Sequence, residues 1–137
     1  MGEAKAPARV LVVTRVSAPK ALVLIEDSGG GELPLIIPGQ LIAATANSIA
    51  VGCAASAATE VAIADIGIVP PAAGVLVFEG RLETPGRRIA VRTILGATLL
   101  EVMVASTDTQ LRVWANAAIE PTELTIGVAR CGGGIAR

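Results

Sequence analysis

The side chains that enzymes most often use as general bases or phenolic acids are missing, because the 137 residues include no His and no Tyr. A Ser–His or Cys–His nucleophile therefore cannot be assembled from this chain alone. Carboxylates remain, but Glu26 and Asp27 adjoin in a predicted strand and would point to opposite faces. Asp108 follows Ser106 and Thr107 in a polar turn, where local backbone hydrogen bonding is the usual role. These patterns favour a non-catalytic protein, with a carboxylate-based enzyme as the less favoured alternative.

Two cysteines and three consecutive glycines are the other candidates for a ligand site. Cys53 and Cys131 lie far apart and lack the spacing of a disulfide framework or a metal site. Cys53 is expected to pack as a small hydrophobic side chain. Glycines 29–31 could cradle a phosphate only before a helix N-terminus, and Glu32-Leu33-Pro34 follows them instead. We therefore expect no metal and no cofactor.

A ladder of charges flanks the turn Thr84-Pro85-Gly86-Arg87. Its charged members are Glu79, Arg81, Glu83, Arg88, Arg92 and Glu101. Pro followed by Gly at the centre of a turn predicts that the two flanking strands pair, with Glu83 opposite Arg88. Continuing that register, and the register of the next connection, would place Arg92 between Glu79 and Glu101. Cross-strand charge pairs of this kind contribute about 0.2 to 1 kcal/mol each.

This ladder has two interpretations. The simpler one, which we favour, is the solvated face of a sheet. The alternative is a specificity rim on a partner-binding face, because Arg is enriched at interfaces and its bidentate pairs with carboxylates fix register. Trp114 would be an anchor of such an interface if it is exposed, although a lone Trp beside Leu111 and Val113 is more often buried. The candidate partner-binding residues are Glu79, Arg81, Glu83, Arg88, Arg92, Glu101 and Trp114.

The elements that must position these residues are mostly strands. Two β-branched runs, 10–16 and 21–26, surround a short Pro-bearing connection and predict a hairpin. The spacing of Ile42, Ala46, Ile49 and Cys53 favours one short helix over 40–51, with a strand as the alternative. Six further strands are predicted at 60–64, 74–82, 88–94, 98–105, 110–115 and 122–129. This order indicates a mainly β protein, an antiparallel β-sandwich with at most one short helix. We expect a single domain over 1–137 with flexible ends at 1–8 and 130–137.

Composition limits the partners. The formal net charge is −1, which argues against nucleic acid and anionic membranes. The first seven residues lack the apolar run of a secretory signal, and residues 41–58 are too polar for a membrane span, so we expect a cytoplasmic protein. Hydrophobic residues make up 53% of the chain and charged residues only 17%, which favours a protein partner or a homo-oligomer that covers apolar surface.

The order of elements also resembles a known family. A β hairpin, a short helix ending at Gly52-Cys53-Ala54-Ala55-Ser56-Ala57 and a following run of strands look like the layout of bacterial competence protein J over residues 21–114. The resemblance implies a small cytoplasmic inhibitor that binds a nuclease. The chain lacks the aromatic residues such proteins use, so no functional residue is carried over. The sequence thus predicts a protein-binding module, and a self-assembling structural subunit is the alternative.

Overall fold

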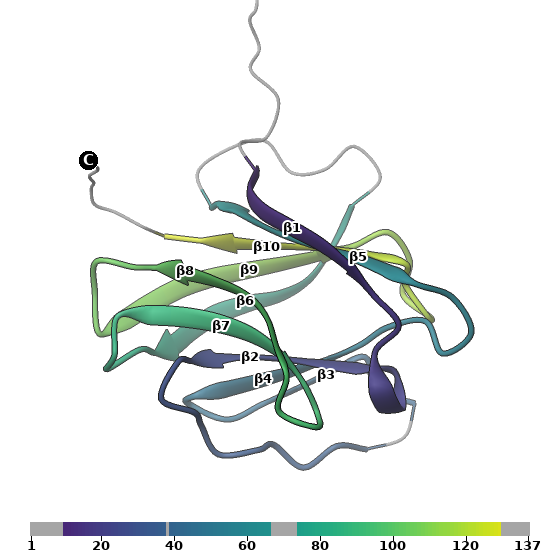
Figure 1. Cartoon of the computed structure of the whole chain (residues 1–137), viewed down its shortest axis with the longest axis horizontal. Coiled ribbons are helices and arrows are strands. Elements are labelled where there is room, and N and C mark those ends of the chain that lie inside the picture. Colours follow the sequence, from purple (N-terminus) through teal and green to yellow (C-terminus); the bar gives the residue numbers. More distant parts are fainter. Residues whose placement is uncertain (1–9, 38, 67–73, 130–137) are drawn as a thin grey trace, which may run out of the picture.

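The described part of the fold consists of strands, one 3₁₀ turn and connecting loops (Figure 1). It was obtained as a computed structural model, and the structure describes residues 10–37, 39–66 and 74–129. The elements are β1 (Val10–Val16), the 3₁₀ turn η1 (Pro19–Ala21), β2 (Leu22–Asp27), β3 (Ile42–Ala44), β4 (Ser48–Gly52), β5 (Thr59–Asp65), β6 (Val75–Glu83), β7 (Arg88–Thr93), β8 (Thr98–Met103), β9 (Asp108–Ala115) and β10 (Glu123–Val128). The six strands predicted after residue 59 are confirmed.

The strands form two five-stranded sheets. The first has the order β1-β5-β10-β9-β6 and the second the order β3-β4-β2-β7-β8. Every neighbouring pair is antiparallel except β5 and β10, which run parallel. The predicted β-sandwich is therefore confirmed, with one parallel pair inside the first sheet.

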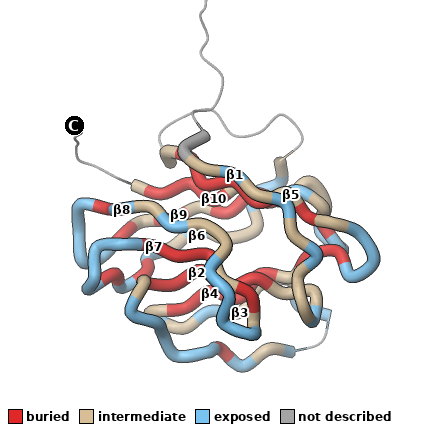
Figure 2. The backbone as a smooth tube through the Cα atoms, viewed as in Figure 1, coloured by how far each residue is buried: buried red, intermediate tan, exposed pale blue. Residues whose placement is uncertain are grey.

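Alternating residues of both sheets build the core between them. Fully buried members include Ile25 and Ile89 from the second sheet and Ile63, Leu111 and Ile126 from the first. Figure 2 shows these buried positions along the strands and the exposed positions mainly on the connecting loops. The largest fully buried side chains are Ile, Leu and Val, so these residue types supply most of the core.

The predicted hairpin of the first two strands is wrong. β1 pairs with β5 of the first sheet, whereas β2 pairs with β4 and β7 of the second. The connection turns through η1, where Lys20 and Ala21 both have left-handed backbone angles, with φ of 60° and 54°. Such angles are uncommon outside glycine, and here they redirect the chain from one sheet to the other.

The predicted helix over 40–51 is also wrong, because β3 and β4 form a hairpin there. Ile49, Val51 and Cys53 all belong to the core, which is the period of two expected for a strand. The helical spacing of the apolar residues was coincidental, since β-branched residues pack well on a pleated sheet. Gly52, expected to end a helix, is the last residue of β4.

The predicted pairing across the Thr84–Arg87 turn is also wrong, because the two strands that flank the turn belong to different sheets. β6 pairs with β9 in the first sheet, and β7 pairs with β2 and β8 in the second. The predicted turn is present, with a hydrogen bond from the Arg87 N–H to the Thr84 carbonyl, but it crosses between the two sheets. The pairing of β7 with β8 is correct, but its register differs by two residues: Ile89 lies opposite Val102, and a bulge places Arg92 opposite Thr98.

Within the described residues, the structure contains no helix of the length and apolar character needed to cross a membrane. The ends predicted to be flexible, 1–8 and 130–137, lie outside the described residues, as does Cys131.

Candidate protein-binding surfaces

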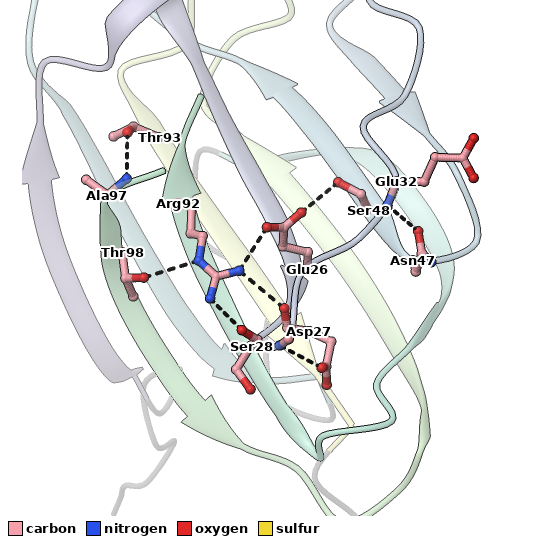
Figure 3. A network of polar contacts seen from close by, with 11 residues as sticks. Glu26, Asp27, Ser28, Glu32, Asn47, Ser48, Arg92, Thr93, Ala97 and Thr98 are labelled. Carbon is pink, nitrogen blue, oxygen red and sulfur yellow. Dashed lines mark hydrogen bonds and ion pairs between the residues drawn. The ribbon is translucent and has the colours of Figure 1, made fainter. Parts of the chain in front are cut away.

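Arg92 is the centre of a largely buried polar network on the second sheet (Figure 3). Its Nη1 donates to Oε2 of Glu26 at 2.8 Å, and its Nη2 donates to the carbonyl oxygen of Ser28 at 2.7 Å. Nη1 also lies 3.3 Å from the Asp27 carbonyl oxygen, and Nε donates to the Thr98 hydroxyl at 3.2 Å. The Arg92 side chain is 16% exposed. Its hydrogen-bonding groups are thus engaged within the chain, and its glutamate partner is Glu26 instead of the predicted Glu79 and Glu101.

Glu26 joins this network from β2, next to β7 in the second sheet. Its second carboxylate oxygen accepts a hydrogen bond from the buried Ser48 hydroxyl at 3.2 Å. Each oxygen of a buried carboxylate needs such a partner, because an unpaired one loses its hydration without compensation. The arrangement therefore joins β4, β2 and β7 by side chains in addition to their backbone ladders.

The neighbouring carboxylate, Asp27, points to the other side of β2 and holds the end of the sandwich. It is buried, and its Oδ1 accepts a hydrogen bond from the Gly86 N–H at 2.8 Å while its Oδ2 accepts one from the Gly29 N–H at 2.9 Å. A side chain at position 86 would place its Cβ 2.9 Å from the Asp27 carboxylate. Asp27 therefore fixes the turn that carries the chain from the first sheet to the second. Glu26 and Asp27 serve different structural roles and are not brought together as a catalytic pair.

Only part of the predicted charged ladder, Glu79, Arg81 and Glu83 on β6, lies on the outer face of the first sheet. Arg112 donates from Nε to Glu79 at 2.9 Å, and Arg81 donates from Nε to Asp108 at 2.8 Å. Glu83 lies opposite Asp108 at the end of β6 and β9. Sequence reasoning did not find the partners Arg112 and Asp108, because the pairing of β6 with β9 joins residues about thirty positions apart.

The seven predicted site residues therefore separate into two groups. Glu79, Arg81, Glu83 and Trp114 belong to the first sheet, on β6 and β9. Arg88, Arg92 and Glu101 belong to the second sheet, where Arg88 Nη1 lies 3.5 Å from Glu101 Oε1. They do not form one continuous ladder, and a role for them in binding remains a prediction.

Trp114 is buried on the outer side of the first sheet. Its neighbours Val113 and Ala115 belong to the core cluster, so alternation turns Trp114 to the opposite face. Its ring lies close to Gly127 of β10, and its exposed fraction is 7%. The expectation that this Trp is buried is confirmed, and little of its surface is open to a partner.

A second surface is a stripe of exposed apolar side chains between β2 and β3. Leu33, Leu35 and Ile37 are exposed, whereas Pro34 is buried and Ile36 is half-buried, which is the alternation of an extended chain. We call Leu33, Leu35 and Ile37 the apolar stripe. The sequence contains this apolar run, closed by Pro38-Gly39, but its pattern does not indicate that alternate members are exposed in the described part of the structure.

The apolar stripe begins at a firmly held point. The Glu32 N–H donates to Oδ1 of Asn47 at 2.8 Å (Figure 3). The Thr45 hydroxyl donates to the Glu32 carbonyl oxygen at 2.8 Å. A side chain on Gly31 would collide with the Asn47 carbonyl oxygen, so the chain passes close against the β3–β4 turn. The segment is thus anchored by its backbone and presents side chains outward.

Cys53 is buried near Thr59. Burial raises the pKa of the Cys53 thiol above its ordinary value of 9.0, and the hydrogen bond with the Thr59 side chain partly opposes that rise. The thiol is consequently protonated at neutral pH and packs in the core as predicted. Among residues 10–37, 39–66 and 74–129, no three His, Cys, Asp or Glu side chains are grouped in a way that could hold a metal ion.

Comparison with solved structures finds the crystal structure of ComJ, an inhibitor of the DNA-degrading activity of NucA, from Bacillus subtilis. The TM-score is 0.67, and the match covers 95% of this chain and 100% of that chain at 11% sequence identity. No protein-family model matches the chain, and no curated protein matches it. The expected likeness to competence protein J is therefore confirmed for the fold, although the helix on which it partly rested is a hairpin.

Proposed function

We propose that this protein is a small, non-catalytic inhibitor that binds a nuclease and blocks its degradation of DNA. The observation that carries the proposal is the ComJ-like fold, which extends over the full length of that inhibitor. Because one fold can host several functions, the proposal also needs a surface suited to a protein partner. The absence of His and Tyr from the sequence supports binding over catalysis.

The apolar stripe is the surface that we assign to the nuclease. Leu35 is 82% exposed and lies between two further exposed apolar side chains. Burial of a large apolar side chain contributes about 1.5 to 3 kcal/mol, and a backbone anchored before binding loses less entropy when a complex forms. The hydrogen bonds of Glu32 to Asn47 and Thr45 supply that anchoring.

We propose that the protein acts in the cytoplasm and that it contacts the nuclease and not the DNA. A net charge of −1 supports that choice, because a direct contact with phosphates would require a clear excess of Lys and Arg. The inhibitor would act by covering the enzyme, so its effect should follow the ratio of inhibitor to enzyme.

Immobilised protein, incubated with extract of the cells that produce it, tests the proposal. We expect the protein to deplete DNA-degrading activity from the extract and to retain a nuclease. Leu35→Asp should retain at least about tenfold less, because an anchor is lost and a charge is placed in an apolar interface. The matched control is Ile119→Asp, since Ile119 is 81% exposed but lies in the loop between β9 and β10.

Two results would contradict the proposal. If the wild-type protein depletes no DNA-degrading activity, the inhibitory function is wrong. If Leu35→Asp and Ile119→Asp bind the nuclease equally well, the function stands and the assignment to the apolar stripe is wrong.

A further inference from the structure

β6 is the last strand of the first sheet, and no strand of the described residues pairs with its outer edge. The direction of its backbone groups can be deduced. The Thr84 N–H donates toward β9, to the Thr107 carbonyl, at 2.8 Å. The Glu83 N–H donates the other way, to the Ala46 carbonyl in the β3–β4 turn, at 2.9 Å. Because these directions alternate along an antiparallel strand, the N–H and C=O groups of Arg81 and Glu79 point away from β9. β6 therefore offers two residues with backbone groups directed outward from the sheet.

The side chains of these two residues carry opposite charges. Glu79 and Arg81 are both exposed on the outer face of the sheet. Two copies of β6 can pair antiparallel about a twofold axis. Three registers bring their outward backbone groups together, and these registers are centred on Glu79, Gly80 or Arg81. Centring on Glu79 or Arg81 places that residue opposite itself, which brings like charges together. Centring on Gly80 places Glu79 opposite Arg81 twice.

We propose that two copies of this protein pair through β6, in the register centred on Gly80. Each Glu79 then lies opposite Arg81 of the second copy, and the two sheets become one of ten strands. Each copy contributes an Arg112–Glu79 pair and an Arg81–Asp108 pair, at 2.9 and 2.8 Å. In this register the charges alternate in sign across the junction from Arg112 through Glu79 and the second Arg81 to the second Asp108.

The new ladder is short. The Glu83 N–H is already bonded to Ala46, and the bulge between Leu76 and Phe78 ends regular pairing at the other side. Two residue pairs lie between these limits, so the dimer should dissociate on dilution. The opposing explanation is that the charges and the bulge of β6 keep this edge unpaired, which is how many proteins protect their edge strands.

Charge reversal separates the two explanations. Sedimentation velocity across a wide range of protein concentration should show a monomer–dimer equilibrium for the wild type. Glu79→Arg alone and Arg81→Glu alone should each raise the dissociation constant by about tenfold or more, since two symmetric attractions become repulsions. The double variant Glu79→Arg/Arg81→Glu should recover dimerisation, because the opposite charges then face each other again.

Contacts within one chain cannot explain a recovery of dimerisation in the double variant. There, an arginine at 79 would repel Arg112 and a glutamate at 81 would repel Asp108, so the internal contacts become worse in both places. Arg88→Glu is the matched control, because it reverses one member of an exposed pair on the second sheet and should leave the equilibrium unchanged. Thermal unfolding of each variant establishes that it is folded.

A wild-type protein that stays monomeric at every concentration would overturn the proposal. So would a dimer that the single reversals leave intact, or one that the double variant fails to restore. The β6 variants leave every residue of the apolar stripe unchanged, so a failure of dimerisation and a failure of nuclease binding are seen in separate measurements.

Discussion

Replacing Arg92 should lower stability instead of affecting only an interface. Arg92→Met removes the guanidinium from Glu26, whose side chain is 10% exposed, and leaves that carboxylate with the Ser48 hydroxyl alone. It also removes donors from the carbonyl oxygens of Asp27 and Ser28. Breaking a buried ion pair from one side costs about 3 to 5 kcal/mol. We therefore expect a loss of about 3 kcal/mol, since Arg92 retains slight exposure, and a midpoint of thermal unfolding lower by about 10 °C.

Urea denaturation followed by circular dichroism measures this loss, and Arg81→Met is the control. Both arginines lie 2.8 Å from a carboxylate, but the Arg81 side chain is 60% exposed and its pair should contribute less than about 1 kcal/mol. The double variant Glu26→Met/Arg92→Met should be more stable than Arg92→Met by at least about 1 kcal/mol, because it no longer buries an unpaired charge. Equal losses for Arg92→Met and Arg81→Met, or a double variant weaker than Arg92→Met, would refute this account of the network.

Two further predictions concern buried residues. Gly127→Ala should cost about 1 to 3 kcal/mol and change the fluorescence of Trp114, because the new Cβ would lie 2.8 Å from the Trp114 ring and 3.2 Å from the Ile66 Cα; an unchanged midpoint and spectrum would argue against this packing. The raised pKa of Cys53 means that the folded protein holds the thiol proton more tightly than the unfolded chain, so its contribution to stability is present below the ordinary pKa of 9.0 and is lost as pH rises above it. Denaturation of wild type and Cys53→Ala should therefore show a steeper alkaline loss in the wild type, and parallel curves would contradict it.

The local pattern of the sequence was sufficient to predict most strands but not the sheet that each one enters. Residues 88–94 and 98–105 alternate and are separated by a turn, and they do pair. The Thr84–Arg87 turn has equally good turn residues, yet it crosses between sheets because Asp27, far away in sequence, holds Gly86. The same kind of distant contact decides the partner of Arg92, since Glu26 lies 66 residues away.

The candidate surfaces were predictable only in part. Glu79 and Arg81 were identified as exposed members of a charged face, but their partners depend on the pairing of β6 with β9. Leu33, Leu35 and Ile37 belong to an apolar run of the sequence, and such a run indicates a buried strand as readily as an exposed one. Their exposure among the described residues is a property of the tertiary structure and not of the local pattern.

Titration of a purified nuclease, captured from the extract, with this protein tests the central claim most directly. As inhibitor is added, the rate of DNA degradation should fall and level off at an equimolar ratio. The concentration needed for the same inhibition should be clearly higher for Leu35→Asp than for Ile119→Asp. A nuclease whose rate is unchanged at a saturating excess of the wild-type protein would contradict the claim that this fold acts as an inhibitor here.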